Sequence, residues 1–229
     1  RRSKEDNFKW CSVRPSFVVG LCPELSPGTQ SIGIALSVYA LILKTRGMHL
    51  AFPGGLGPWT AKIQFSTSEK IAEVAEFATR QHSGTILNVT SCPEFSWSQV
   101  WDAVGEYFDI PTEGPRNEFA GENSEIVAGP HAELIWKRLQ AAHELQDEPF
   151  AHVLNFDFLD KSFTAGYDSI FSSDLIRKLG FPEDRVFEYE DAKAVLYQYF
   201  DRLVADKLIP DPKNVISGIY SVFVDDGIV

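Results

Sequence analysis

The sequence KWCSVRPSFVVG, residues 9–20, decides how the rest of the chain is interpreted. Residues 10–19 are rich in β-branched and aromatic side chains, and the run stops at Gly20. A largely apolar run that enters a loop in this way is typical of a buried strand in a parallel sheet. The sequence therefore predicts an α/β protein with a parallel strand close to its first residue.

Strand and helix patterns alternate after this strand. The sequence predicts helices over residues 29–46, 66–81 and 97–108, and strands over residues 48–52, 63–65 and 85–89. Ser66 with Glu69, and Ser96 with Gln99, have the spacing of a capping box at a helix start. The glycine- and proline-rich stretch 53–58 is expected to be a loop. Alternation of this kind is typical of an α/β layer.

The character of the sequence changes after Pro111. Residues 112–130 are polar and acidic, and the patterns that follow predict helices over residues 130–145, 168–179 and 188–207 without a strong strand. We therefore expect two domains, an α/β domain over residues 1–111 and a mostly helical one over residues 112–229.

Charge and composition exclude several classes of protein. The 229 residues carry a formal net charge of -11 and no cluster of Lys and Arg, so we expect no nucleic-acid partner. The longest apolar run, residues 32–43, is too short to cross a bilayer, so no membrane partner is expected. The three cysteines have the spacing of neither a metal site nor a disulfide framework, which predicts reduced thiols and a cytoplasmic location.

Several common catalytic motifs do not occur in this sequence. There is no G-x-G-x-x-G after a strand and no Gly-x-Ser-x-Gly, and no two histidines stand four residues apart. The sequence therefore assigns no catalytic residue and no metal site.

Seven short motifs occur in the order and near the spacing of one known group of enzymes. They are Arg14-Pro15 with Gly20, Val38-Tyr39-Ala40, Phe52-Pro53-Gly54, Leu87-Asn88-Val89, Phe95-x-Trp97 with Trp101, Leu179-Gly180-Phe181 and Lys207-x-Ile209-Pro210. From Phe8 to Pro210 the chain resembles the C-terminal part of the progesterone 5-beta-reductase and iridoid synthase-like (PRISE-like) enzymes, which are extended short-chain dehydrogenases.

The resemblance implies a Rossmann-type fold, NADP(H) as cofactor, and reduction of a conjugated enone or enal in a small apolar metabolite of specialised metabolism. It places Pro15, Ser16 and Val18 beside the cofactor, and Leu25, Ser26 and Phe181 beside the substrate. The glycine-rich motif and the catalytic Tyr and Lys of the family would lie upstream of Arg1. We therefore expect residues 1–111 to be a remnant of the Rossmann-type domain that lacks its N-terminal nucleotide-binding half, and residues 112–229 to be a substrate-binding cap. NADP(H) would bind only if the upstream half is present.

Two alternatives stay open at the level of sequence. Ser91-Cys92 replaces the Asn-Gly that follows the Asn-Val strand in the family, which points to an altered substrate. One alternative is a redox-silent relative that acts as an isomerase, cyclase or dehydratase on an apolar metabolite. The other is a non-catalytic module that pairs with a partner or forms a homodimer through exposed sheet edges.

Overall fold

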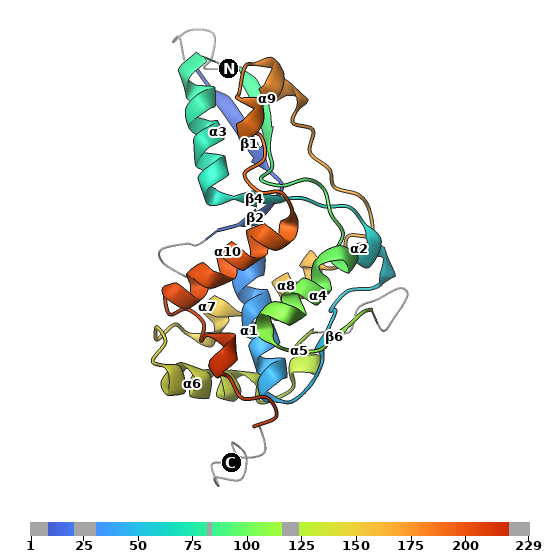
Figure 1. Ribbon diagram of the computed structural model, residues 1–229, viewed down its shortest axis with the longest axis vertical. Helices are drawn as coiled ribbons and strands as arrows, with labels where there is room; N and C mark the ends of the chain where they lie inside the picture. Colours follow the sequence, from blue (N-terminus) through green and yellow to red (C-terminus); the bar gives the residue numbers. More distant parts are fainter. Residues whose placement is uncertain (1–8, 21–30, 82–83, 116–123, 220–229) are drawn as a thin grey trace. The chain divides into compact units, whose positions relative to one another are not determined.

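The computed structural model describes residues 9–20, 31–81, 84–115 and 124–219 (Figure 1). The chain forms two compact units, and each is assembled from segments that are distant in the sequence. The sheet unit comprises Arg1–Gly20, Lys62–Phe95 and Asp168–Val195, and the helical unit comprises Leu21–Ala61, Ser96–Tyr167 and Leu196–Val229. These units divide the chain by packing, whereas the boundary expected near residue 111 divides it by composition and role. That boundary stays a prediction.

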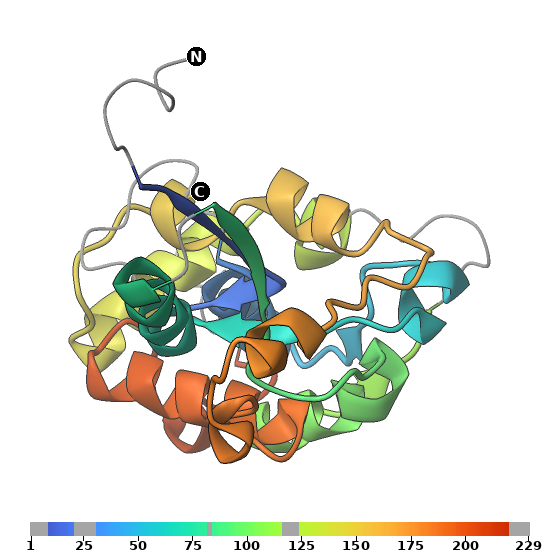
Figure 2. The same cartoon turned by 90° about the horizontal axis from the view of Figure 1, so that it is seen from above.

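Parallel strand pairs form the centre of the sheet unit. Strand β1 (Cys11–Pro15) pairs in parallel with β5 (Thr85–Val89), with Val13 opposite Leu87. The two strands run side by side in Figure 2, β1 in dark blue and β5 in green. Strand β2 (Phe17–Val19) pairs in parallel with β4 (Phe65–Thr67). The predicted α/β fold with parallel strands is therefore confirmed.

Ser16 is the point at which the apolar run 10–19 changes its neighbour. The Ser16 amide donates to the Val89 carbonyl at 3.1 Å, at the end of the β1–β5 ladder. The next amide, that of Phe17, donates to the Gln64 carbonyl at 3.2 Å, where the β2–β4 ladder begins. What reads as a single strand in the sequence is thus two strands that meet at one residue.

Helices cover one face of the β1–β5 pair. Helix α3 (Ser68–Gln81) lies along β1, and α9 (Asp174–Lys178) and the short 3₁₀ helix η2 (Glu183–Arg185) follow later in the chain (Figure 1). Alternate residues of β5 point into the core that these elements enclose, because side chains along a strand alternate between its two faces. The core residues are Val74, Ala78, Leu87, Val89, Ile176, Phe181 and Val186.

The helical unit is built around α1 (Ile32–Thr45), whose residues are all buried. Helices α4 (Trp97–Phe108), α5 (Ser124–Ala128), α6 (Ala132–His143), α7 (Phe150–Val153) and α8 (Phe156–Ser162) all contact α1. A helix that is apolar all round is stable only when neighbours surround it, and this arrangement supplies them. Helix α10 (Ala192–Ala205) begins in the sheet unit and continues into the helical unit, and η3 (Pro212–Asn214) follows it.

The remaining two strands belong to the helical unit. Strand β3 (Leu50–Ala51) pairs in parallel with β6 (Thr112–Glu113). In the described residues from Thr112 onward, β6 is the one strand and the other regular elements are helical. This confirms the mostly helical character predicted for the second half. None of the helices in the described residues has the length and apolar character that a bilayer crossing requires.

The predicted loop over residues 53–58 is wrong in its second half, where α2 (Leu56–Thr60) forms. Pro58 is the third residue of this helix. The first amides of a helix have no partner within the helix, so a proline there removes no hydrogen bond.

At the next predicted helix start, the capping box of Ser66 and Glu69 is also wrong. Helix α3 begins two residues later, and Thr67 Oγ1 accepts from the Lys70 amide at 3.2 Å. Residues 65–67 are instead β4, so the strand predicted over 63–65 was placed too early.

The predicted helix over residues 168–179 is shorter than expected, since α9 covers only Asp174–Lys178. Residues before it bond to another segment: the Ser169 amide donates to the Lys62 carbonyl at 2.7 Å, and the Phe171 amide donates to Gln64 Oε1 at 2.8 Å. These contacts between distant residues outweigh the local helical pattern. By contrast, the predicted helix 97–108 and strand 85–89 have the same bounds in the structure, and the Ser96 amide donates to Gln99 Oε1 at 2.8 Å in the expected capping box.

Candidate functional site

The carboxyl ends of the parallel strands in the sheet unit form the candidate site. Parallel strands end at a common edge, and ligands of open α/β sheets bind outside that edge. Here β1 ends at Pro15, β5 at Val89 and β4 at Thr67. Side chains with hydroxyl groups gather at these ends, and they form two hydrogen-bonded groups.

Ser16 and Ser66 form the first group, which we call the serine pair. Ser66 Oγ donates to the Val89 carbonyl at 2.8 Å and accepts from the Ser16 amide at 2.9 Å. The two hydroxyl oxygens are 2.7 Å apart. A serine hydroxyl has one proton, and that of Ser66 points to Val89, so Ser16 must be the donor between the two hydroxyls. Ser16 Oγ therefore keeps both of its acceptor lone pairs for another group.

Thr67, Ser91 and Glu188 form the second group, which we call the threonine relay. Thr67 Oγ1 donates to Glu188 Oε2 at 2.7 Å and lies 3.0 Å from Ser91 Oγ. Because the single Thr67 proton is directed at the carboxylate, Ser91 is the donor to Thr67. Ser91 Oγ in turn accepts from the Thr67 amide at 2.9 Å. The chain of donors ends on the negative charge of Glu188, where a hydrogen bond is stronger than one between neutral groups.

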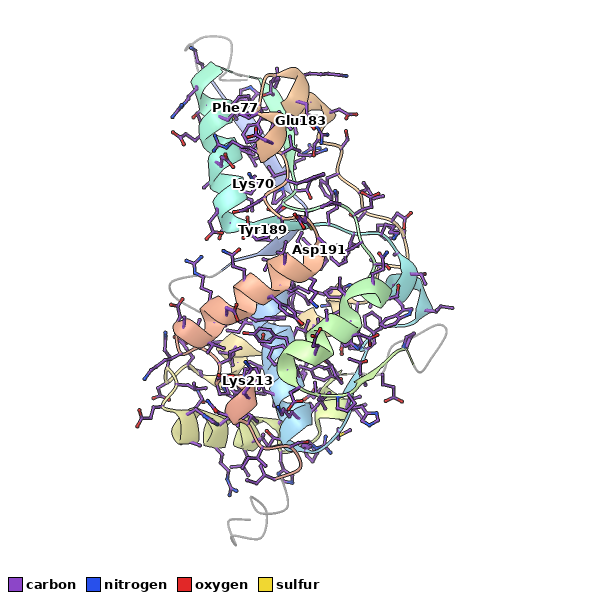
Figure 3. The ribbon with its side chains drawn as sticks, in the orientation of Figure 1. Lys70, Phe77, Glu183, Tyr189, Asp191 and Lys213 are labelled. Carbon is purple, nitrogen blue, oxygen red and sulfur yellow. The ribbon has the colours of Figure 1, made fainter. Side chains whose placement is uncertain are left out.

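The segment around Glu188 is held at the end of β5 by its backbone. The amides of Glu188 and Tyr189 both donate to the Ser91 carbonyl, at 2.9 and 3.0 Å. Tyr189 is labelled in Figure 3 near the ends of the strands. Burial raises the pKa of the Tyr189 phenol, and the charges of Glu188 and Glu69 raise it further, so this phenol stays protonated at neutral pH.

Lys70 lies in the first turn of α3 and is almost fully buried. Its Nζ donates to Glu73 Oε2 at 2.5 Å and to the Arg185 carbonyl at 2.7 Å, and Arg185 also pairs with Glu73. Burial lowers the pKa of Lys70, the charge of Glu188 opposes this, and the charge of Arg185 lowers it further. The protons of this ammonium group are directed at protein acceptors, which indicates a structural role.

The structure places four of the six predicted site residues. Pro15 ends β1, Ser16 belongs to the serine pair, and Val18 lies on β2 with 39% of its surface exposed. Phe181 is 5% exposed in the core of the same unit, 5.2 Å from Phe77 between ring centroids, with Lys70 Nζ 5.7 Å from the centre of its ring. Leu25 and Ser26 lie outside the described residues. The cofactor and substrate roles of all six residues stay predictions.

The sequence reasoning missed Ser66, Thr67, Ser91 and Glu188. For the first three a signal existed, because short hydroxyl side chains at or just after a strand end are natural candidates for its carboxyl edge. Glu188 gave no such signal. It lies in an acidic run whose plain interpretation is solvation, and only the fold brings it to Thr67.

The side chains at this edge limit the chemistry that they can perform. Cys92 follows Ser91 and is fully buried, and burial raises the pKa of its thiol to about 11, so it carries no nucleophilic thiolate at neutral pH. In the part of the chain that the structure describes, no three His, Cys, Asp or Glu side chains cluster as a metal ion requires. The edge supplies neutral hydroxyls and one carboxylate, which are suited to binding and orienting a ligand.

Comparison with known sequences identifies the family. The sequence model described as "PRISE-like Rossmann-fold domain" matches residues 1–210. The chain belongs to this family. The resemblance drawn from seven motifs is thereby confirmed, and the parallel strands of the sheet unit are the part of this PRISE-like fold that carries the candidate site.

Curated relatives of the PRISE-like chain are oxidoreductases. It is 24% identical over 193 residues to the short chain dehydrogenase sirR of Leptosphaeria maculans, covering 78% of this chain and 47% of that protein. It is 26% identical over 160 residues to the 3-oxo-Delta(4,5)-steroid 5-beta-reductase of Arabidopsis thaliana, covering 69% and 40%. It is 24% identical over 181 residues to the (S)-8-oxocitronellyl enol synthase of Catharanthus roseus, covering 77% and 45%. The chain spans about half the length, or less, of these relatives.

Proposed function

We propose that the chain is the C-terminal portion of an NADPH-dependent reductase that acts on a conjugated enone or enal in a small apolar metabolite. The family and its oxidoreductase relatives support this class of reaction. One relative is named for a 3-oxo-Delta(4,5)-steroid, in which a carbonyl is conjugated with a double bond. Another is named for an enol product, and an enol is what results when hydride adds to a conjugated carbonyl compound.

The observation that carries the proposal is the free acceptor capacity of Ser16 at the carboxyl edge. A nicotinamide ring carries a carboxamide whose NH₂ group needs an acceptor, and Ser16 Oγ has two lone pairs that the serine pair does not use. The exposed side chain of Val18 offers apolar surface on the strand that follows. Both features suit an aromatic ring with one polar substituent, so the residues present fit this part of NADP(H).

In this proposal the chain's own residues bind and orient the cofactor and the substrate. Bound NADPH supplies the hydride. The ring of the cofactor is held by Pro15, Ser16 and Val18. Ser66 fixes the orientation of the Ser16 hydroxyl by accepting the hydrogen bond that this hydroxyl donates. Leu25, Ser26 and Phe181 are proposed to face the substrate. The group that protonates the product is not assigned to any residue of this chain.

The test is an assay of NADPH oxidation at 340 nm on the full product of the gene that encodes this chain. Progesterone serves as the enone and citral as the enal. In the Ser16→Ala variant we expect the Kd for NADPH to rise about fivefold, the loss of one hydrogen bond. Ser12→Ala is the matched control, since it removes a hydroxyl from the same strand at the other end of the ladder.

The outcomes separate the proposal from its alternative. NADPH-dependent loss of the double bond, weakened by Ser16→Ala and unchanged by Ser12→Ala, supports the reductase. Rearrangement or dehydration of the substrate at the same rate with and without NADPH contradicts it, and establishes the redox-silent isomerase, cyclase or dehydratase instead.

A further inference from the structure

A cavity of about 430 Å³ in the helical unit is lined by none of the residues assigned above. It is lined by residues from α4, α10 and the segment around η3, among them Tyr107 and Tyr197. Val204 and Pro212 contribute apolar surface. Pockets of this size accommodate a small organic molecule. We call it the tyrosine cavity.

The charged groups of the tyrosine cavity are mostly acidic. Glu106, Asp201 and Asp211 line it together with a single basic residue, Lys213, which is labelled in Figure 3. Two of the carboxylates accept from neutral donors of the protein. Asp201 Oδ1 accepts from Tyr107 at 2.8 Å, and Asp211 Oδ1 accepts from the Lys213 amide at 3.0 Å. The Tyr197 hydroxyl donates to the Ala103 carbonyl at 2.9 Å and lies 3.2 Å from Glu106 Oε2. The bonds to Asp201 and Asp211 fix these two carboxylates in place without cancelling their charge.

The two tyrosine rings meet edge to face, with centroids 5.1 Å apart and an angle of 64° between their planes. Tyr107 also packs against Phe108 and Phe200, which holds its ring still. The Tyr107 hydroxyl donates a hydrogen bond to the Asp201 carboxylate. Such a donor bond shifts electron density into the ring, and an electron-rich ring face attracts a cation more strongly.

We propose that the tyrosine cavity binds a small organic ammonium ion, with the cation against the tyrosine rings and its charge balanced by Asp201 and Asp211. Aromatic rings, fixed carboxylates and apolar surface are together what recognises a cation that is too bulky to be fully hydrated. An anion would meet the three carboxylates, and a neutral molecule would make no use of them. This binding site is independent of the reductase function proposed above.

Choline is the probe that tests the charge requirement. Its neutral isostere 3,3-dimethyl-1-butanol replaces the quaternary nitrogen with carbon and leaves size and shape almost unchanged. Titration of the 229-residue chain is followed by the NMR signals of the ligand, which broaden and shift on binding. We expect choline to bind about tenfold more tightly than the alcohol, within the range measured for cation–aromatic contacts.

Variants at exposed or half-buried positions test the assignment to this cavity without disturbing the core. Asp201→Asn keeps an acceptor for the Tyr107 hydroxyl and removes one charge, so we expect the Kd for choline to rise about threefold. The double variant Asp201→Asn and Asp211→Asn removes two charges, so we expect the Kd for choline to rise about tenfold. Asparagine caps turns as aspartate does, so the turn at residue 211 should be kept. Asp206→Asn is the matched control, because Asp206 is an exposed carboxylate beyond the end of α10 that does not line the cavity.

The proposal is overturned by any of three results. Equal affinity for choline and 3,3-dimethyl-1-butanol would show that charge is not recognised, and no binding of choline would show that the cavity takes no ammonium ion. An equal effect of Asp206→Asn and Asp201→Asn would show that choline responds only to the net charge of the protein. Tighter choline binding in Lys213→Gln, which removes the one cation of the lining, is a further expected result.

Discussion

The sheet unit and the helical unit treat their buried polar groups in opposite ways. In the sheet unit, Ser16 is buried at a strand end and keeps unused acceptor capacity. In the helical unit, the buried Lys44 directs its ammonium group at three acceptors of the protein: the carbonyls of Phe108 and Pro212 and the carboxylate of Asp109. A polar group whose capacity is fully used serves stability, whereas one with unused capacity is available to a ligand. The predictions below test this distinction, from the largest expected effect to the smallest.

Substitution of Gly33 by alanine tests how tightly the helical unit is packed. A Cβ atom at this position in α1 would lie 2.2 Å from Cε1 of Tyr199, far inside van der Waals contact. Gly33 and Tyr199 are both buried, so the Tyr199 ring has little room to move away. We expect Gly33→Ala to lower the free energy of unfolding by about 3 kcal/mol, measured by urea denaturation.

The control for this substitution is Ser37→Ala, one turn further along the same helix. Ser37 Oγ bonds to the Gly33 carbonyl, which already has its helical partner, so the loss should stay below about 0.5 kcal/mol. Similar losses in the two variants would show that α1 does not depend on close packing at Gly33.

Removal of the Lys44 ammonium group tests the structural half of the comparison. In Lys44→Met the carbonyls of Phe108 and Pro212 lose a charged donor, and we expect the free energy of unfolding to fall by about 2 kcal/mol. Asp109→Asn is the matched control. Its side chain is 82% exposed, so the ion pair itself should contribute less than about 0.5 kcal/mol. A larger loss for Asp109→Asn than for Lys44→Met would mean that the ion pair, and not the carbonyls, holds this lysine.

The serine pair contains one hydroxyl whose hydrogen-bonding capacity is fully used and one with unused capacity, so it tests the distinction between them within a single hydrogen bond. Ser66 Oγ uses its donor and both acceptor positions, so Ser66→Ala should cost about 1.5 kcal/mol of unfolding free energy. Ser16→Ala should cost only about 0.5 kcal/mol, because the Ser16 amide keeps its bond to the Val89 carbonyl. Thermal and urea unfolding of the two variants measure this difference, and the reverse order would contradict the allocation of protons in the pair.

Alkaline unfolding reports on the buried Tyr199 in the helical unit. Burial raises the pKa of this phenol to about 12 from its usual 10, against the opposing effect of its 2.8 Å contact with Ser31 Oγ. Between these two values the unfolded chain loses the proton while the folded chain keeps it, so stability falls as the pH rises. Below pH 10 the Tyr199 phenol is protonated in both the folded and the unfolded chain, so it contributes no change of stability with pH.

Tyr199→Phe removes this titration. We expect the variant to lose about 1 kcal/mol at pH 8, since the contact with Ser31 is gone, and to lose less additional stability than the parent between pH 10 and 12. Parallel stability curves over that interval would show that Tyr199 does not titrate with a raised pKa. Tyr107→Phe does not serve as a control, because burial and Asp201 raise the pKa of Tyr107 as well.

Elements with strong local signals were predictable from the sequence. The helix over 97–108 has an apolar face and a capping box, and the strand over 85–89 is apolar between turn residues, so local forces and tertiary packing favour the same structure. The expected helix over 168–173 did not form, because Ser169 and Phe171 bond to residues about a hundred positions away, which no local pattern reveals. Likewise the loop predicted over residues 53–58 misses the start of α2, because the position of Pro58 in the first turn of this helix is not evident from the sequence.

The candidate site was only partly predictable for the same reason. Resemblance to the family pointed to Ser16, and the structure adds what sequence could not supply: the neighbour Ser66, which determines how the Ser16 hydroxyl is oriented. The link between Thr67 and Glu188 joins residues 121 positions apart. Such contacts depend on how β4 and the segment after η2 meet, and that is a property of the fold.

The most direct test of the central claim is hydrogen exchange, measured by mass spectrometry, on the full gene product with and without NADP⁺. The account predicts that the cofactor slows exchange in peptides that cover Ser16 to Val19 and Thr90 to Cys92, at the carboxyl edge of the sheet unit, and leaves α6 unchanged. Saturating NADP⁺ that protects other segments while these peptides exchange at their original rate would contradict it.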